Sequence, residues 1–257
     1  MKKTALIAAA LALAGVSNAQ NAVTAKPSYS VTSDFSYTSE YVFRGIKQSN
    51  AAFQGSIEVG QDDARIGVWT SQPMNSKQYS NETDFYAGYK IKLSRDLTAD
   101  LVGTYYYYPE SDSLAPARLH HSYEVGVGGI YNLGGLNPGF AGVSASLYYY
   151  YDFRLKAQTV QASLGYSLAL KEIGTSIDFN VFGGTESGSN LAPDRNTGVR
   201  KTGESWNYYG FGVNVPYKLA ENAQVHVGAS LSQNDKFFYD FHPHQNASIS
   251  AGLTIGF

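Results

Sequence analysis

The stretch "SYSVTSDFSYTSEYVF", residues 28–43, alternates apolar and polar side chains along its length. Val31, Phe35 and Tyr37 fall on one face of an extended chain, whereas Thr32 and Asp34 fall on the other. Alternation of this kind predicts a β-strand with one apolar face. At about 16 residues, this strand would be much longer than the 5–6 residues usual in soluble sheets.

The same alternation closes the chain in "NASISAGLTIGF", residues 246–257, and recurs in about ten segments between the two. A total of about twelve strands is an even number, as in single-chain barrels of the bacterial outer membrane. Beyond the N-terminal segment no apolar run approaches the ~20 residues of a spanning helix. The mean hydropathy of −0.25 also fits a barrel, because half of its strand residues face a polar lumen.

The connections between these segments alternate between short and long, with one short exception, "RLK" at 154–156, among the long ones. "QDD" at 61–63 and "KEIG" at 171–174 are short, whereas 109–121 and 185–204 are long. A soluble sandwich has no reason to sort its loops in this way, but membrane barrels combine short periplasmic turns with longer extracellular loops. We therefore predict an all-β fold, a transmembrane antiparallel up-and-down β-barrel of about 12 strands.

The first residues have the pattern of a secretory signal peptide. Lys2 and Lys3 precede an apolar stretch, and small residues at Ser17 and Ala19 predict cleavage before Gln20. We expect residues 1–19 to be removed and residues 20–257 to form one barrel domain in the bacterial outer membrane, in contact with its lipid. The chain has no cysteine, and its formal net charge of −2 does not suggest a nucleic-acid partner.

Two runs of four tyrosines, in "GTYYYYP" (103–109) and "LYYYYDF" (147–153), place rings on both faces of their strands. The predicted topology puts both runs at the outer ends of rising strands, where membrane barrels carry an aromatic girdle. One half of each run should face lipid, and the other half should pack inward at the mouth of the barrel. The predicted outer aromatic rim consists of Tyr41, Phe43, Tyr105, Tyr106, Tyr107, Tyr108, Tyr148, Tyr149, Tyr150, Tyr151, Trp206, Tyr208 and Tyr209.

Two motifs resemble known exported proteins. The chain ends on Phe257 with apolar residues at alternate positions before it, which resembles the C-terminal insertion signal read by the barrel-assembly machinery. The stretch "YTSEYVFRGIKQSN", residues 37–50, resembles the opening of the TorF-type porin family of proteobacterial outer-membrane barrels. Glu40 stands where aspartate is commoner in that family. The resemblance implies an outer-membrane barrel and brings no catalytic residues with it.

The sequence gives little support to catalysis or to a cofactor. It has five histidines and no G-x-S-x-G motif. His226 falls on the polar face of a strand, where it is expected to hydrogen-bond in the lumen. The loop histidines His120, His121, His242 and His244 are better explained as solvated residues than as metal ligands, although His242 and His244 alternate with Asp240.

Acids outnumber bases on the predicted inner face. Arg44 and Arg65 can pair with Glu40, Glu58 or Asp84 and reduce the field locally, whereas Asp100, Glu124, Asp152 and Asp178 have fewer basic neighbours and should dominate it. The predicted pore-lining residues are Asp34, Glu40, Arg44, Glu58, Asp84, Lys90, Asp100, Glu124, Asp152, Asp178 and His226.

Twelve strands and small inward side chains predict a narrow water-filled pore, between the filled eight-stranded barrels and the open porins of 16–18 strands. We therefore expect a non-enzymatic outer-membrane channel for passive diffusion of small polar solutes, with a mild preference for cations. Two alternatives remain: a structural or adhesive barrel that acts through its extracellular loops, and an outer-membrane hydrolase.

Overall fold

The computed structural model describes residues 29–74, 81–109, 120–188, 204–235 and 244–257. The predicted signal peptide lies outside these residues. Twelve strands form a closed antiparallel barrel in which each strand pairs with its neighbour along the chain and β1 also pairs with β14. The barrel strands are β1 (Ser30–Thr38), β4 (Ala52–Gln61), β5 (Ala64–Pro73), β6 (Glu82–Lys92), β7 (Leu97–Tyr107), β8 (His121–Asn132), β9 (Val143–Asp152), β10 (Ala157–Leu170), β11 (Thr175–Gly188), β12 (Glu204–Ala220), β13 (Ala223–Asn234) and β14 (Gln245–Gly256).

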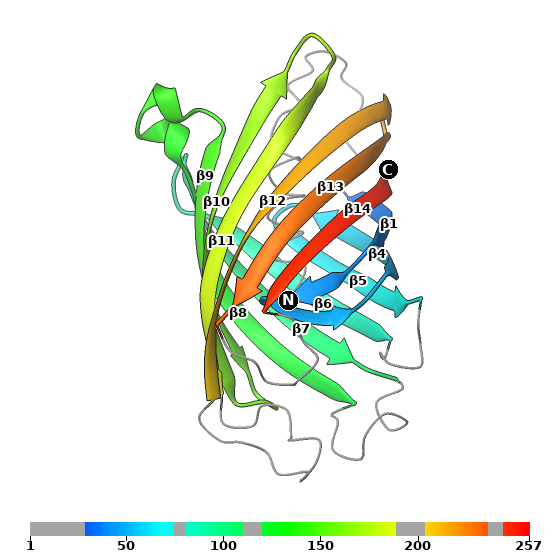
Figure 1. The fold of residues 1–257 in the computed structure, drawn as a ribbon. Coiled ribbons are helices and arrows are strands. Elements are labelled where there is room, and N and C mark those ends of the chain that lie inside the picture. The colour runs from blue at the N-terminus through cyan, green and yellow to red at the C-terminus, as the bar shows by residue number, and fades with distance from the viewer. Residues whose placement is uncertain (1–28, 75–80, 110–119, 189–203, 236–243) are drawn as a thin grey trace.

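Short connections gather at one end of the barrel, which is uppermost in Figure 1. The longest of them, between β8 and β9, contains two short 3-10 helices, η1 (Leu133–Gly135) and η2 (Pro138–Phe140). The longer connections leave the opposite end, together with one short turn, 153–156 between β9 and β10. This sorting confirms the barrel and its arrangement of turns and loops, which follow the outer-membrane pattern.

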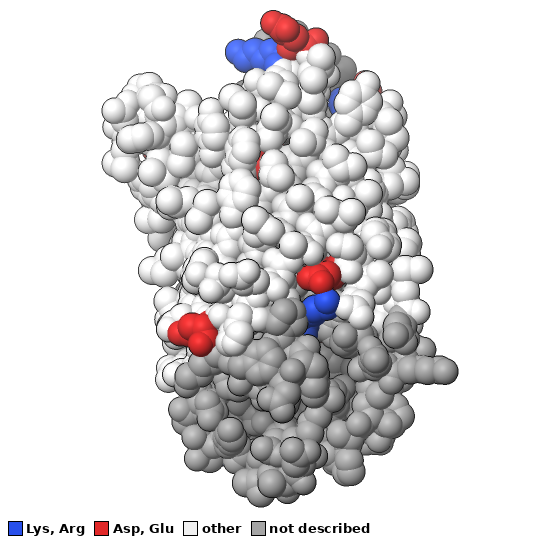
Figure 2. All heavy atoms as spheres, in the orientation of Figure 1, with Lys and Arg blue, Asp and Glu red and all other residues white. Residues whose placement is uncertain are grey.

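The outer face of the barrel is apolar. Alternate residues of every barrel strand expose large apolar side chains, and Val127, Val181 and Ile249 are about half exposed or more. Figure 2 shows a broad face almost free of charged atoms, with acids and bases gathered toward its two ends. An apolar surface of this size is not stable in water, but it suits the hydrocarbon core of a bilayer.

The chain end completes the barrel seam. Phe257 exchanges two backbone hydrogen bonds with Val31, at 2.8 and 3.0 Å, and leaves its ring 72% exposed. The ring therefore continues the outward stripe of β14. Its use as an assembly signal stays a prediction.

Glycines explain how the barrel holds tyrosines on both faces of a strand. The inward rings of Tyr148 and Tyr150 lie flat over Gly128 and Gly126 of the neighbouring strand, and a Cβ on either glycine would approach the ring to 2.3 Å. The two rings also stack on each other with centroids 5.5 Å apart. The same arrangement joins Tyr86 with Gly67, Tyr208 with Gly184, Arg65 with Gly88 and His226 with Gly252. Large inward side chains therefore occupy little of the bore.

One prediction about the strands is wrong. Residues 28–43 do not form one long strand, because β1 ends at Thr38, which pairs with Ala52 of β4. The chain between them folds into a separate hairpin of two strands, β2 (Tyr41–Phe43) and β3 (Ile46–Ser49). We call residues 39–51 the inner hairpin, because its side chains pack against residues of the inner wall.

Tyr41 and Phe43 are consequently not part of an outer aromatic rim. Tyr41 is 6% exposed and packs against Trp69, with ring centroids 5.3 Å apart. Phe43 packs against the buried cluster of Tyr106, Tyr148 and Tyr150. The alternation of this segment is real, but its apolar side chains are buried by the inner wall instead of by lipid.

Candidate functional site

The inner hairpin turns at Arg44 and Gly45, which both have positive φ, 49° and 75°. The Arg44 side chain is 5% exposed and reaches two carboxylates of the wall. Its Nη1 lies 2.6 Å from Glu186 on β11, and its Nη2 lies 3.2 Å from Glu124 on β8. The guanidinium also lies over the rings of Phe43 and Tyr150, with 5.0 and 5.4 Å to the centroids, in the geometry of a cation–π contact.

Backbone contacts hold the tip of the inner hairpin as well. Trp206 Nε1 donates a hydrogen bond of 3.1 Å to the Arg44 carbonyl oxygen. The Gly45 carbonyl oxygen accepts from Asn234 and Asn246, at 2.7 and 3.1 Å. A Cβ on Gly45 would lie 2.7 Å from Cβ of Tyr208, so only glycine fits this close approach to the wall.

The base of the inner hairpin is joined to the wall on its other side. Tyr41 donates a hydrogen bond of 2.8 Å to Glu82 at the start of β6, and Tyr108 donates to the other oxygen of Glu82 at 3.3 Å. Within the hairpin, Lys47 pairs with Glu40 at 2.5 Å. Polar contacts thus fix both ends of this segment inside the barrel.

A second buried ion pair lies on the wall itself. Arg65 on β5 forms a bidentate salt bridge with Asp100 on β7, with two hydrogen bonds of 2.9 and 3.0 Å. Tyr148 donates a further hydrogen bond of 2.9 Å to the same carboxylate. Lys90 is the cross-strand neighbour of Asp100. Asp100 is completely buried, so its charge is balanced locally by the Arg65 guanidinium.

Between the inner hairpin and the short turns, a cavity of about 720 Å³ occupies the lumen. The inner hairpin forms part of its lining through Tyr41, Phe43 and Arg44. Its walls are mainly small or polar side chains of β1 and of β9 to β14, among them Ser144, Ser230 and many glycines. We call this cavity the vestibule.

Four predicted pore acids line the vestibule, and one of them, Glu40, is paired with Lys47 of the inner hairpin. Asp34 accepts a hydrogen bond from Thr254 at 2.7 Å and lies 2.8 Å from Nε2 of His226. Asp178 accepts from Ser167 at 2.6 Å, and Glu58 accepts from Tyr86 at 2.9 Å.

The other predicted pore acids have different surroundings. The Ser122 hydroxyl donates to the Asp152 carboxylate, with Oγ 2.7 and 2.6 Å from its two oxygens, and Asp152 also caps the turn after β9 by accepting from the backbone amides of Arg154 and Leu155. Asp84 is completely buried on β6 opposite Tyr106 of β7. Neither acid is among the residues that line the vestibule.

The predicted ion pairing is wrong in its partners. Arg44 and Arg65 do not pair with Glu40, Glu58 or Asp84, but with Glu124, Glu186 and Asp100. Asp100 and Glu124, which were expected to dominate the field of the pore, are therefore the acids that the arginines neutralise. Long side chains reach across strands, and strand register is needed to say which partner they meet.

Sequence reasoning also missed two buried acids. Glu186 falls within the predicted loop 185–204, but β11 continues to Gly188, and Glu82, absent from the predicted pore lining, begins β6. Continued alternation from Ile177, Phe179 and Val181 would have placed Glu186 on the inner face.

The remaining aromatic residues of the predicted rim divide between the two faces. Trp206 and Tyr208 are buried against the inner hairpin residue Ile46. Tyr151 contacts Phe153 edge-on. The exposed members on the outer face are Tyr105, Tyr107, Tyr149 and Tyr209.

The loop histidines give no metal site in the described part of the chain, where no group of three or more potential ligands gathers. His121 stacks on Tyr105 with ring centroids 5.7 Å apart, and His244 lies 3.3 Å from the Asn234 carbonyl oxygen. His242 lies outside the described residues. Within the described ranges no helix has the length and apolar character to cross a membrane.

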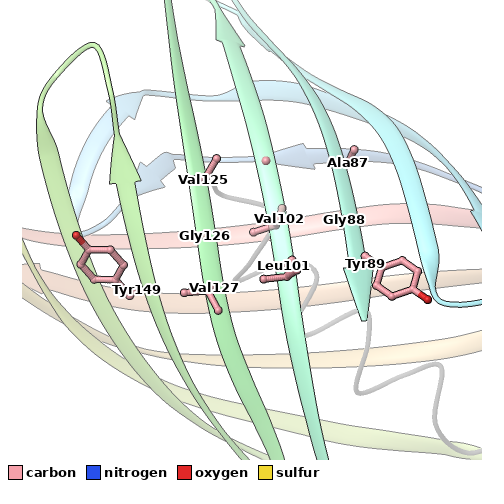
Figure 3. A pocket seen from close by; sticks show the side chains of 10 residues that line it. Ala87, Gly88, Tyr89, Leu101, Val102, Val125, Gly126, Val127 and Tyr149 are labelled. Carbon is pink, nitrogen blue, oxygen red and sulfur yellow. The ribbon is translucent and has the colours of Figure 1, made fainter. Parts of the chain in front are cut away.

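A second depression lies on the outside of the barrel. It has a volume of about 630 Å³ and an apolar lining that includes Leu101, Val125 and Val127. Figure 3 shows Tyr149 and Tyr89 on either side of it, across strands β6 to β9. Because Leu101, Val125 and Val127 are exposed on the outer face, this depression belongs to the apolar outer surface and has no part in the lumen.

Solved structures with a similar fold are barrels of outer-membrane channels. The KdgM porin has a TM-score of 0.52 at 13% identity, over 88% of this chain and 99% of its own. The NanC porin has a TM-score of 0.54 at 12% identity, over 88% and 98%. The COG4313 outer membrane channel from Pseudomonas putida F1 has a TM-score of 0.54 at 13% identity, over 94% and 100%. The class of protein is thus an outer-membrane-type β-barrel.

The chain belongs to the family described as "Bacterial protein of unknown function (Gcw_chp)", whose model matches residues 22–168. This match includes the inner hairpin and β1 to β9. No curated protein matches the sequence. The narrower resemblance to TorF-type porins stays a prediction.

Proposed function

We propose that this protein is a channel of the bacterial outer membrane that passes small polar solutes by passive diffusion, with a mild preference for cations. The observation that carries the proposal is the vestibule, a cavity of about 720 Å³ with carboxylate, hydroxyl and amide groups in its lining, inside a barrel whose outer face is apolar. A structural barrel has no need of an interior space that holds such groups. The absence of enzymatic activity remains a prediction.

The lining of the vestibule supports passage of polar solutes. Serine, threonine, asparagine and glycine dominate its β12 to β14 side, where Asn214, Ser230 and Ser250 contribute hydroxyl or amide groups. Such groups replace part of the hydration shell of a solute without binding it tightly, which suits diffusion through a pore.

The charges of the vestibule favour cations. Among the described residues, no base forms an ion pair with Glu58 or Asp178. Arg44, at the outer end of the vestibule, is neutralised by Glu124 and Glu186. Because the screening length at physiological salt is about 8 Å, the electrostatic field of Glu58 and Asp178 extends over much of a narrow lumen.

This proposal predicts the effect of removing both charges. Planar bilayers that contain the folded protein, held in a salt gradient, are expected to show a reversal potential of the sign for cation preference, weaker at high salt. The double variant Glu58→Gln/Asp178→Asn should lose most of that preference and still conduct. The matched control is Asp62→Asn/Glu172→Gln, which removes the same charge from exposed turns and should leave the reversal potential unchanged.

A reversal potential of the anion-selective sign in the unmodified protein would contradict the cation preference. Equal shifts in both double variants would show that net charge, and not the vestibule acids, sets the selectivity.

A further inference from the structure

The inner hairpin is an excursion from an otherwise complete wall. Thr38 and Ala52, which flank it, are paired neighbours on β1 and β4, and the β1–β4 ladder runs from that pair to Ser30 and Gly60. No strand of the barrel depends on β2 or β3 for its pairing, since these two strands form their own sheet. The barrel can therefore close without this segment.

The tip of the inner hairpin meets the far side of the barrel. The hairpin leaves the wall between β1 and β4, yet its Arg44 side chain contacts β8 and β11. The Gly45 carbonyl oxygen meets β13 and β14, the strands that follow β1 around the barrel. In the closed barrel, β8 is the fourth strand from β4 when counted through β5, and β11 is the fourth strand from β1 when counted through β14. Both strands therefore lie across the barrel from the base of the hairpin. The segment thus crosses the lumen on the long-loop side of the vestibule.

The large inward side chains of the wall lie against the wall and do not extend into the centre of the lumen, where the hairpin lies. Tyr86, Tyr148, Tyr150 and Tyr208 lie flat over glycines of adjacent strands, and Arg65 lies over Gly88 in the same way. Within the described ranges, the inner hairpin is the segment that leaves the wall and spans the bore.

We propose that the inner hairpin is the constriction of the channel and that Arg44 is the latch that holds it across the lumen. The inference rests on the proposed channel function and adds its permeability-limiting element. Arginine keeps its charge at all relevant pH values and matches carboxylates with directed hydrogen bonds. Glu124 and Glu186 supply these carboxylates from two separate strands, so the latch fixes the hairpin between them.

If Arg44 holds the hairpin through its ion pairs, removal of the arginine and removal of its two carboxylate partners should have the same effect on conductance. Arg44→Gln and Glu124→Gln/Glu186→Gln should both raise single-channel conductance in planar bilayers, and the triple variant should add little to either, because interacting residues are not additive. Lys171→Gln removes one positive charge from an exposed turn and serves as the control, with unchanged conductance expected.

The decisive variant replaces residues 39–51 by Asn-Gly, a two-residue turn that suits an antiparallel hairpin. Heat-modifiable migration in gels should show that this variant still folds, since the β1–β4 pairs remain. Its conductance should rise several-fold over the unmodified protein, and larger neutral solutes should pass.

The possible results separate the two proposals. Equal conductance in the unmodified protein and in the folded deletion variant would overturn the constriction and leave the channel function standing. No openings in either folded protein would overturn both. A deletion variant that does not fold would contradict the inference that the barrel closes without this segment, and equal conductance in the Arg44→Gln protein would then overturn the latch.

Discussion

Replacement of Arg65 by methionine is expected to lower the free energy of unfolding of the barrel by about 3–5 kcal/mol, the usual cost of removing one partner from a buried ion pair. Arg65 and Asp100 have side chains that are 6% and 0% exposed, and they share two hydrogen bonds. After the substitution, Tyr148 remains as a donor to Asp100 and Lys90 remains its cross-strand neighbour, but the guanidinium that pairs with the buried carboxylate is lost. Urea unfolding in lipid vesicles measures the loss.

The double variant Arg65→Met/Asp100→Leu is the matched control. It removes both charges, so no buried charge is left unpaired, and stability should recover most of the loss, as is common when a buried pair gives way to apolar residues. A single variant as stable as the unmodified barrel would show that water or another base reaches Asp100.

Arginine in place of Val227 is expected to destabilise the barrel by about 2–4 kcal/mol, the range for a base at the bilayer midplane. Val227 lies on β13, is 55% exposed on the outer face and pairs with Val215 and Ala251. In a bilayer its surroundings are acyl chains, so a guanidinium there loses its hydration. Equilibrium folding into vesicles reports the difference.

The control for this prediction is Ser230→Arg, three positions further along β13. Ser230 faces the vestibule, where water solvates a charge, so the cost should be much smaller. Glycines of the inner face are unsuitable controls, because a Cβ on Gly252 would lie 2.5 Å from the His226 ring. Equal losses at Val227 and Ser230 would mean that the assignment of the two faces is wrong.

The barrel wall was predictable because one physical pattern, the alternation of strands between lipid and lumen, repeats in every strand. It located the turns and the outward faces, such as those of Phe35, Val127 and Ile249. The same pattern led to the wrong assignment of Tyr41 and Phe43. A hairpin that packs against the inner wall buries its alternate residues just as a lipid-facing strand does, and alternation does not distinguish apolar protein from apolar lipid.

The charged contacts of the lumen were not predictable for a different reason. Arg44 meets Glu186 across 142 positions of the chain, and the contact depends on the path of the hairpin and on the register of strands far apart in sequence. The sequence does contain one local sign of this site: Arg44-Gly45 inside an apolar alternation favours a turn, because glycine readily adopts positive φ. Read in this way, the "FRG" motif predicts an interruption of the strand.

Liposome swelling tests the central proposal, an outer-membrane channel for small polar solutes, most directly. Liposomes that contain the folded, heat-modifiable barrel are diluted into iso-osmotic solutions of small sugars, amino acids and amines, and the decrease in light scattering is recorded. The account predicts swelling well above that of protein-free liposomes. Swelling should be faster for small cationic solutes than for anionic solutes of the same size. The variant that lacks residues 39–51 should give faster swelling than the unmodified barrel. Swelling no greater than that of protein-free liposomes, for the unmodified barrel and for this variant alike, would contradict it.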